Sequence, residues 1–81
     1  MAETPTEAIL ALLAARGDGK TICPSEAARK LAGPQGNWRA EMDTVHAAVD
    51  ALTAQGAIAL SWQGRPKSER RGPYRITRRT V

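Results

Sequence analysis

Two short alternating stretches near the C-terminal end of the sequence limit the fold more than any other feature. Residues 57–62 (AIALSW) and 74–78 (YRITR) alternate small or polar residues with larger apolar or aromatic ones. Residues 63–73, which lie between them, hold two Gly and two Pro. Alternation on both sides of a loop rich in Gly and Pro predicts a β-hairpin. Its apolar face is expected to combine Ile58, Leu60, Trp62, Tyr74 and Ile76.

A helix is expected near the start of the chain. Thr4 can cap its N-terminus, Pro5 suits its first position, and Glu7 can complete a capping box. The apolar pattern runs to about Arg16, and Gly17 supplies the exit. Because the middle of this segment is apolar on nearly all sides, we expect the helix to be well buried.

Two more helices are expected before the hairpin. Residues 21–23 (TIC) predict a short strand that adds to the hairpin, and Pro24 then opens a second helix that ends in the loop 32–36. The third helix begins at Asn37 or restarts near Thr44, and both starts remain open. Its core-facing stripe is Val45, Ala48, Val49 and Leu52, with the spacing i, i+3, i+4, i+7.

Length and composition limit the number of domains and the kinds of site that the chain can form. Eighty-one residues favour one domain, 1–81, and the absence of Phe requires a core of aliphatic residues. One Cys and one His exclude an internal disulfide and a common structural zinc site, and we expect no cofactor. The start of the chain lacks the basic segment of a signal peptide, and the longest apolar run, residues 8–15, is far shorter than the roughly 20 residues of a membrane helix. A cytoplasmic protein without membrane contact is therefore expected.

Charge is divided unevenly along the sequence. Residues 1–62 carry five cations and seven anions, whereas residues 63–81 carry seven cations and one anion. The two parts have net charges of −2 and +6. Such a split indicates a basic arm that meets a polyanion, although a solvated basic tail is the alternative.

The expected order of elements resembles the winged helix-turn-helix, an α+β fold with three helices, a short strand and a C-terminal hairpin, the wing. More narrowly, the chain resembles a bacterial family of small proteins of unknown function. The matching segments are Gly19-Lys20-Thr21-Ile22-Cys23-Pro24-Ser25-Glu26, Ala28-Arg29, Trp38-Arg39, Gly56-Ala57-Ile58, Gly64-Arg65-Pro66 and Arg71-Gly72-Pro73. The broader plan implies DNA binding, with the helix before the hairpin in the major groove and the wing on the backbone. Many winged helices bind proteins instead.

Two sets of residues are candidates for contact with double-stranded DNA. In the wing, phosphate contacts are expected from Arg65, Lys67, Arg70, Arg71 and Arg75. In the third helix, the candidates are Arg39, Thr44, His46 and Ala47. Base reading favours Arg, Asn or Gln, whereas this helix carries Asp43 and Asp50 among its exposed positions. The sequence therefore indicates contact with the backbone more strongly than recognition of bases.

Other reactive or aromatic side chains have structural explanations. Cys23 precedes a helix start, where a thiolate is stabilised, but beside an apolar strand it is expected to act as a small hydrophobe. His46 is expected to be a surface residue. Trp38 and Trp62 are expected to pack, with base stacking by an exposed Trp62 as the alternative.

Two functions follow from the sequence. The first is a DNA-binding winged helix, either a weak or non-specific binder or a small transcriptional regulator. The second is a protein-interaction module or homodimer on the same fold. No catalytic arrangement of residues is visible, so we do not expect an enzyme.

Overall fold

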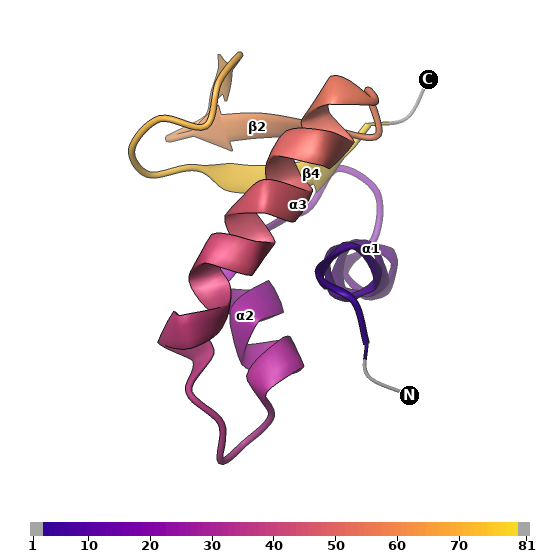
Figure 1. Ribbon diagram of the computed structural model, residues 1–81. Coiled ribbons are helices and arrows are strands. Elements are labelled where there is room, and N and C mark those ends of the chain that lie inside the picture. The colour runs from indigo at the N-terminus through magenta and orange to yellow at the C-terminus, as the bar shows by residue number, and fades with distance from the viewer. Residues whose placement is uncertain (1–2, 80–81) are drawn as a thin grey trace.

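Three α-helices and a four-stranded antiparallel sheet make up the computed structural model, which describes residues 3–79 (Figure 1). This is the α+β class that the sequence predicts, and the topology is compatible with a winged helix. In Figure 1, α3 crosses in front of the strands, and α1 and α2 lie below them. In chain order the elements are α1 (Pro5–Arg16), β1 (Thr21–Ile22), α2 (Pro24–Ala32), the 3-10 helix η1 (Trp38–Glu41), α3 (Met42–Ala54), β2 (Ile58–Trp62), β3 (Arg65–Lys67) and β4 (Arg75–Arg78).

The first helix begins and ends where the sequence predicts. The Thr4 hydroxyl accepts a hydrogen bond from the backbone N–H of Glu7 at 3.1 Å, and the Glu7 carboxylate accepts one from the backbone N–H of Thr4 at 2.8 Å. This reciprocal capping box satisfies two of the N–H groups that a helix start leaves without partners. The last helical residue is Arg16, as expected.

The expectation that α1 is well buried is wrong. Ala8, Ile9 and Leu13 are at most 1% exposed, but Leu10 is 39% exposed. In an apolar helix, every side is a possible inner side, so the sequence does not show which face packs. The packing of α1 against α2, α3 and β1 selects one stripe and leaves the opposite one in solvent.

The third helical segment combines both of the starts that the sequence left open. A 3-10 turn follows Asn37, and the α-helix then begins at Met42, two residues before Thr44. The expected stripe on α3 is confirmed, since Val45 and Val49 are fully buried and Leu52 is 4% exposed.

The strand order in the sheet is β1-β4-β2-β3. The third strand expected at residues 21–23 is present as the two-residue β1, which pairs with β4. Ile76 lies in β4 opposite Ile22 of β1 and also opposite Leu60 of β2. These three residues form one apolar row across the sheet, and all are at most 3% exposed.

The sequence predicted one long loop at residues 63–73. The first part of this prediction is wrong, because Arg65–Lys67 form the strand β3. Gln63 and Gly64 both have positive φ angles, 52° and 80°, and Trp62 pairs with Arg65 across them. Positive φ at both central residues is the pattern of a type I′ turn, whose usual sequences are Asn-Gly and Asp-Gly. Gln-Gly makes the same turn here but is not its usual signal.

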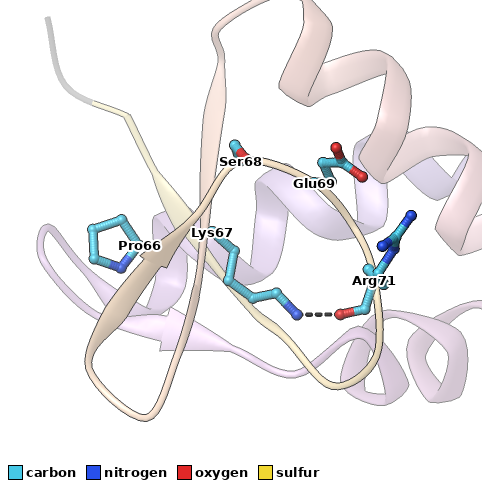
Figure 2. A pocket seen from close by; sticks show the side chains of 5 residues that line it. All are labelled: Pro66, Lys67, Ser68, Glu69 and Arg71. Atoms are coloured by element: carbon cyan, nitrogen blue, oxygen red, sulfur yellow. Dashed lines mark hydrogen bonds between the residues drawn. The ribbon is translucent and has the colours of Figure 1, made fainter.

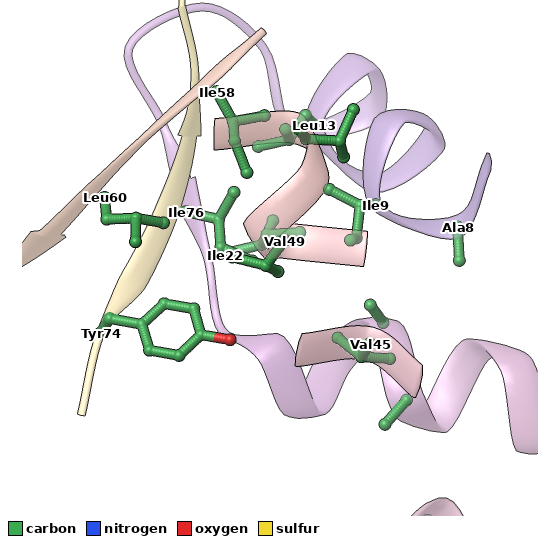
Figure 3. Packing of buried hydrophobic residues seen from close by; sticks show 13 residues of the cluster. Ala8, Ile9, Leu13, Ile22, Val45, Val49, Ile58, Leu60, Tyr74 and Ile76 are labelled. Carbon is green, nitrogen blue, oxygen red and sulfur yellow. The ribbon is translucent and has the colours of Figure 1, made fainter. Parts of the chain in front are cut away.

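The core lies between the helices and the inner face of the sheet (Figure 3). Of the five residues expected on the apolar face of the hairpin, four are buried, and Tyr74 is only 4% exposed. The fifth, Trp62, is 39% exposed because it lies at the end of β2, where the strand leaves the helices.

Leu13 and Leu10 offer a matched test of this packing, since both are in α1 and replacing either with Ala removes the same atoms. Leu13→Ala is expected to lower the free energy of unfolding by about 2–5 kcal/mol, because it leaves a cavity in the core. Leu10→Ala is expected to cost less than about 1 kcal/mol. Urea unfolding followed by circular dichroism measures both, and equal losses would contradict the assigned inner face of α1.

Candidate nucleic-acid interface

The wing consists of β2, β3 and the segment 68–74 that returns to β4. Pro66, Lys67, Ser68, Glu69 and Arg71 line a shallow hollow of about 320 Å³ in it (Figure 2). The Lys67 ammonium donates to the backbone carbonyl of Arg71, and also to that of Pro73 at 2.9 Å. Lys67, a predicted phosphate contact, thus holds the returning segment in shape.

Arg70 connects the wing to α3. Its guanidinium forms a two-point ion pair with Asp50, with Nε–Oδ1 and Nη2–Oδ2 distances of 2.9 and 3.1 Å. The hydrogen bonds from Arg70 hold the pKa of Asp50 below its ordinary value. Arg70 therefore neutralises an anion on the outer side of α3 and, in this conformation, is not directed at a separate ligand.

A second contact between the wing and α3 joins Tyr74 and His46. The Tyr74 hydroxyl and His46 Nδ1 are 2.6 Å apart. Burial raises the pKa of Tyr74 to about 12, so the hydroxyl keeps its proton and can donate to a neutral imidazole. His46 is half-buried and hydrogen-bonded rather than a free surface residue, and its Nδ1 is occupied.

Arg75 lies on β4 beside the edge strand β1. Its guanidinium donates to the Thr21 hydroxyl at 2.8 Å and to the Thr21 carbonyl at 3.2 Å. Because β1 has only two residues, such side-chain bonds help to hold it on the sheet. Arg75 is therefore separate from the surface formed by the wing and α3.

Arg65 and Arg71 remain as exposed cations of the wing. Within residues 3–79, neither side chain makes a hydrogen bond or an ion pair in this structure. Of the five cations predicted from the sequence to contact phosphate, these two are available without breaking an interaction among the described residues. The other three have partners within the protein.

The outer side of α3 carries small and acidic side chains. Thr44 and Ala47, two of the predicted contacts, are exposed, and Asp43 and Asp50 are exposed on the same helix. Neither a hydroxyl nor a methyl group provides the bidentate donor that reads a purine. This surface allows close approach of a ligand but has little means to discriminate among bases.

Arg39, the remaining candidate, lies in η1 before α3. Its guanidinium carbon is 4.4 Å from the ring centroid of Trp38, and the guanidinium carbon of Arg29, from α2, is 4.6 Å from a Trp38 ring. The half-buried Trp38 contributes to packing, as expected, because its indole joins α2 to η1. We call Arg29, Trp38 and Arg39 the arginine–tryptophan corner.

Other chemistry has little support in the part of the chain that the structure describes. Cys23 is half-buried, and its sulfur lies 3.1 Å from the Ser25 hydroxyl. Across residues 3–79, no three His, Cys, Asp or Glu side chains gather into a possible metal site. None of the described helices is long and apolar enough to cross a membrane.

Comparison with known protein families identifies the family of this chain. The model of the family described as "Protein of unknown function (DUF3253)" matches residues 2–79. The chain belongs to this family. The match agrees with the resemblance to small proteins of unknown function that the sequence indicated. A search of curated proteins found no match.

Sequence reasoning did not find the contacts that connect the wing to α3. The partners in His46–Tyr74 are 28 positions apart and those in Asp50–Arg70 are 20 apart, so no local spacing signals them. Arg29 was also missed as a partner of Trp38. The periodicity of α2 places Arg29 on an exposed face, but only the path of the loop after α2 brings the indole to it.

The His46–Tyr74 contact predicts a pH dependence of stability. Partial burial, and then the nearby Arg70, lower the pKa of His46 from its ordinary value of 6.5. As the pH falls below about 6.5, the unfolded chain binds a proton before the folded one does, so stability decreases until the folded-state pKa is passed. Above about 6.5 this contribution is fully present.

Urea unfolding of the wild type and of His46→Gln between pH 5 and 7.5 measures the effect. Since His46 is the sole histidine, the variant is expected to show a smaller loss of stability across this range. The same slope in both proteins, or an NMR-titrated pKa of 6.5 or above, would contradict the prediction.

Proposed function

We propose that this protein is a winged-helix module that binds duplex DNA through its phosphate backbone, with little recognition of bases. The observation that supports this most directly is the pair of exposed guanidinium groups on the wing, those of Arg65 and Arg71, which have no partner among residues 3–79. They belong to a segment, residues 63–81, with a net charge of +6. Arg65 lies in the strand β3, and Lys67 holds the segment that carries Arg71 through the carbonyls of Arg71 and Pro73.

The surface of α3 supports the non-specific character of the proposed binding. Thr44 and Ala47 are short enough for a groove wall to approach, but they offer no bidentate donors. His46 Nδ1 is already bonded to Tyr74. Affinity would then come mainly from phosphate contacts, which depend on salt and carry little sequence information. A binding role of this kind, in gene regulation or DNA organisation, requires no catalytic group.

Binding to a mixed-sequence duplex at several salt concentrations tests the proposal. Each phosphate contact contributes about −0.9 to the slope of log K against log salt. Arg65→Gln and Arg71→Gln are each expected to reduce the magnitude of this slope by about 0.9. Lys20→Gln, which removes an exposed cation from the turn after α1, is the charge-matched control and is expected to change it less. An absence of binding at low salt, or an affinity that does not vary with salt, would reject the proposed function.

The outer side of α1 favours a second candidate, a homodimer or protein-interaction module. Leu10 is 39% exposed, and Ala11 and Ala14 are also exposed on this side. Residues three and four apart are neighbours on a helix surface, so Ala14 adjoins both Ala11 and Leu10, and the three form a small apolar patch. Such a patch is able to pack against a second helix.

Light scattering at increasing protein concentration distinguishes this candidate. A dimer is expected for the wild type, and Leu10→Glu is expected to convert it to a monomer, because a carboxylate would be buried in the interface. Gln35→Glu adds the same charge on an exposed loop and is expected to leave the dimer intact. A wild type that stays monomeric throughout would count against a homodimer.

A further inference from the structure

The arginine–tryptophan corner brings two positive charges to one indole, and neither has an anionic partner within residues 3–79. Both guanidinium carbons lie within 4.6 Å of a Trp38 ring, and both arginines are exposed. Among the described residues neither forms an ion pair, and Glu41, in the same 3-10 turn as Arg39, pairs with neither. By contrast, the neighbouring Lys30 pairs with Glu3 at 3.5 Å.

The indole explains how two like charges stay at one place. The face of an aromatic ring attracts each guanidinium, whereas the guanidinium groups repel each other. A nearby anion would offset this repulsion, and a guanidinium that is stacked on a ring can still donate hydrogen bonds from its edge. A phosphate suits this role because its oxygens match the forked geometry of arginine.

The surface beside the pair is open. Arg29 and Trp38 line a shallow depression of about 400 Å³ together with Lys30, Gly33, Pro34 and Gly36. None of the described residues that line it is acidic. A phosphate group that enters the depression therefore meets no carboxylate among these lining residues.

The corner and the wing meet α3 at different points along its length. Arg39 lies before α3, which begins at Met42, whereas Arg70 of the wing contacts Asp50, eleven residues after Arg39. The corner and the wing are therefore two separate cationic groups beside the same helix.

We propose that Arg29 and Arg39 contact the phosphate backbone of the same duplex that the wing contacts, as a second anchor; this rests on the proposed DNA binding. Trp38 holds both guanidinium groups at this corner, and its packing between α2 and η1 fixes the position of the pair.

Duplex titrations with matched variants test the second anchor. Arg29→Gln and Arg39→Gln are each expected to weaken binding about three- to tenfold and to reduce the salt slope by about 0.9, more than Lys20→Gln does. Arg39→Lys keeps the charge and is expected to retain most of the slope. If a glutamine variant does not fold, the Arg-to-Lys variant and the Trp38 signal below still provide the test.

The two tryptophans provide an independent NMR readout. DNA is expected to shift the indole N–H signal of Trp38, and this shift is expected to weaken in Arg39→Gln. In a separate titration, inorganic phosphate alone is added and the same Trp38 signal is followed. A Trp38 shift with phosphate but not with DNA would overturn the duplex assignment in favour of a free anion.

The outcomes separate this inference from the proposed function. If DNA binds and Arg65→Gln weakens it, but both corner variants match Lys20→Gln, the second anchor is wrong and wing binding stands. If corner variants weaken binding and wing variants do not, the anchor stands and the wing contact is wrong. If the wild type does not bind DNA, the proposed function and the second anchor both fail.

Discussion

The row formed by Ile22, Ile76 and Leu60 connects the last part of the chain to the helices that precede it. Ile76 pairs with both of the other residues, and all three are buried against the helical core. A one-residue slip of β4 would turn Ile76 to the opposite face and bring a polar neighbour, Arg75 or Thr77, into the core. The register of β4 is therefore set by burial, and with it the position at which the returning wing segment passes α3.

That position brings charged and polar groups of the wing next to those of α3. Arg70 reaches Asp50, and Tyr74 reaches His46, so two contacts hold the returning segment along the helix. Ion pairs on an exposed surface contribute little to stability individually. Here these contacts matter because they orient the returning segment. They determine which cations have partners and which ones, like Arg65 and Arg71, project from the surface.

The parts of the fold that depend on local chemistry could be predicted from the sequence, while those that depend on distant contacts could not. The capping box at Thr4 and the stripe on α3 each rest on residues within two helical turns of one another. The type I′ turn at Gln63-Gly64 is also local, but it uses a residue that seldom signals it, so β3 was missed. At the candidate site, sequence charge identified the wing correctly as a basic segment. It did not show that Lys67, Arg70 and Arg75 have partners within the protein, because these partners are brought together by the fold.

For the proposed duplex contact, the Asp50–Arg70 pair has an effect that differs from a direct phosphate contact. Without Arg70, α3 would carry two unpaired carboxylates, Asp43 and Asp50, toward a strongly anionic ligand. With it, Asp50 is neutralised, and the negative charge of this surface is reduced by one at the point where the wing meets α3. Arg70 would thus favour the approach of phosphates by removing a repulsion, while Arg65, Arg71 and the corner supply the attraction. In this arrangement, a basic wing and an acidic α3 are compatible in one DNA-binding surface.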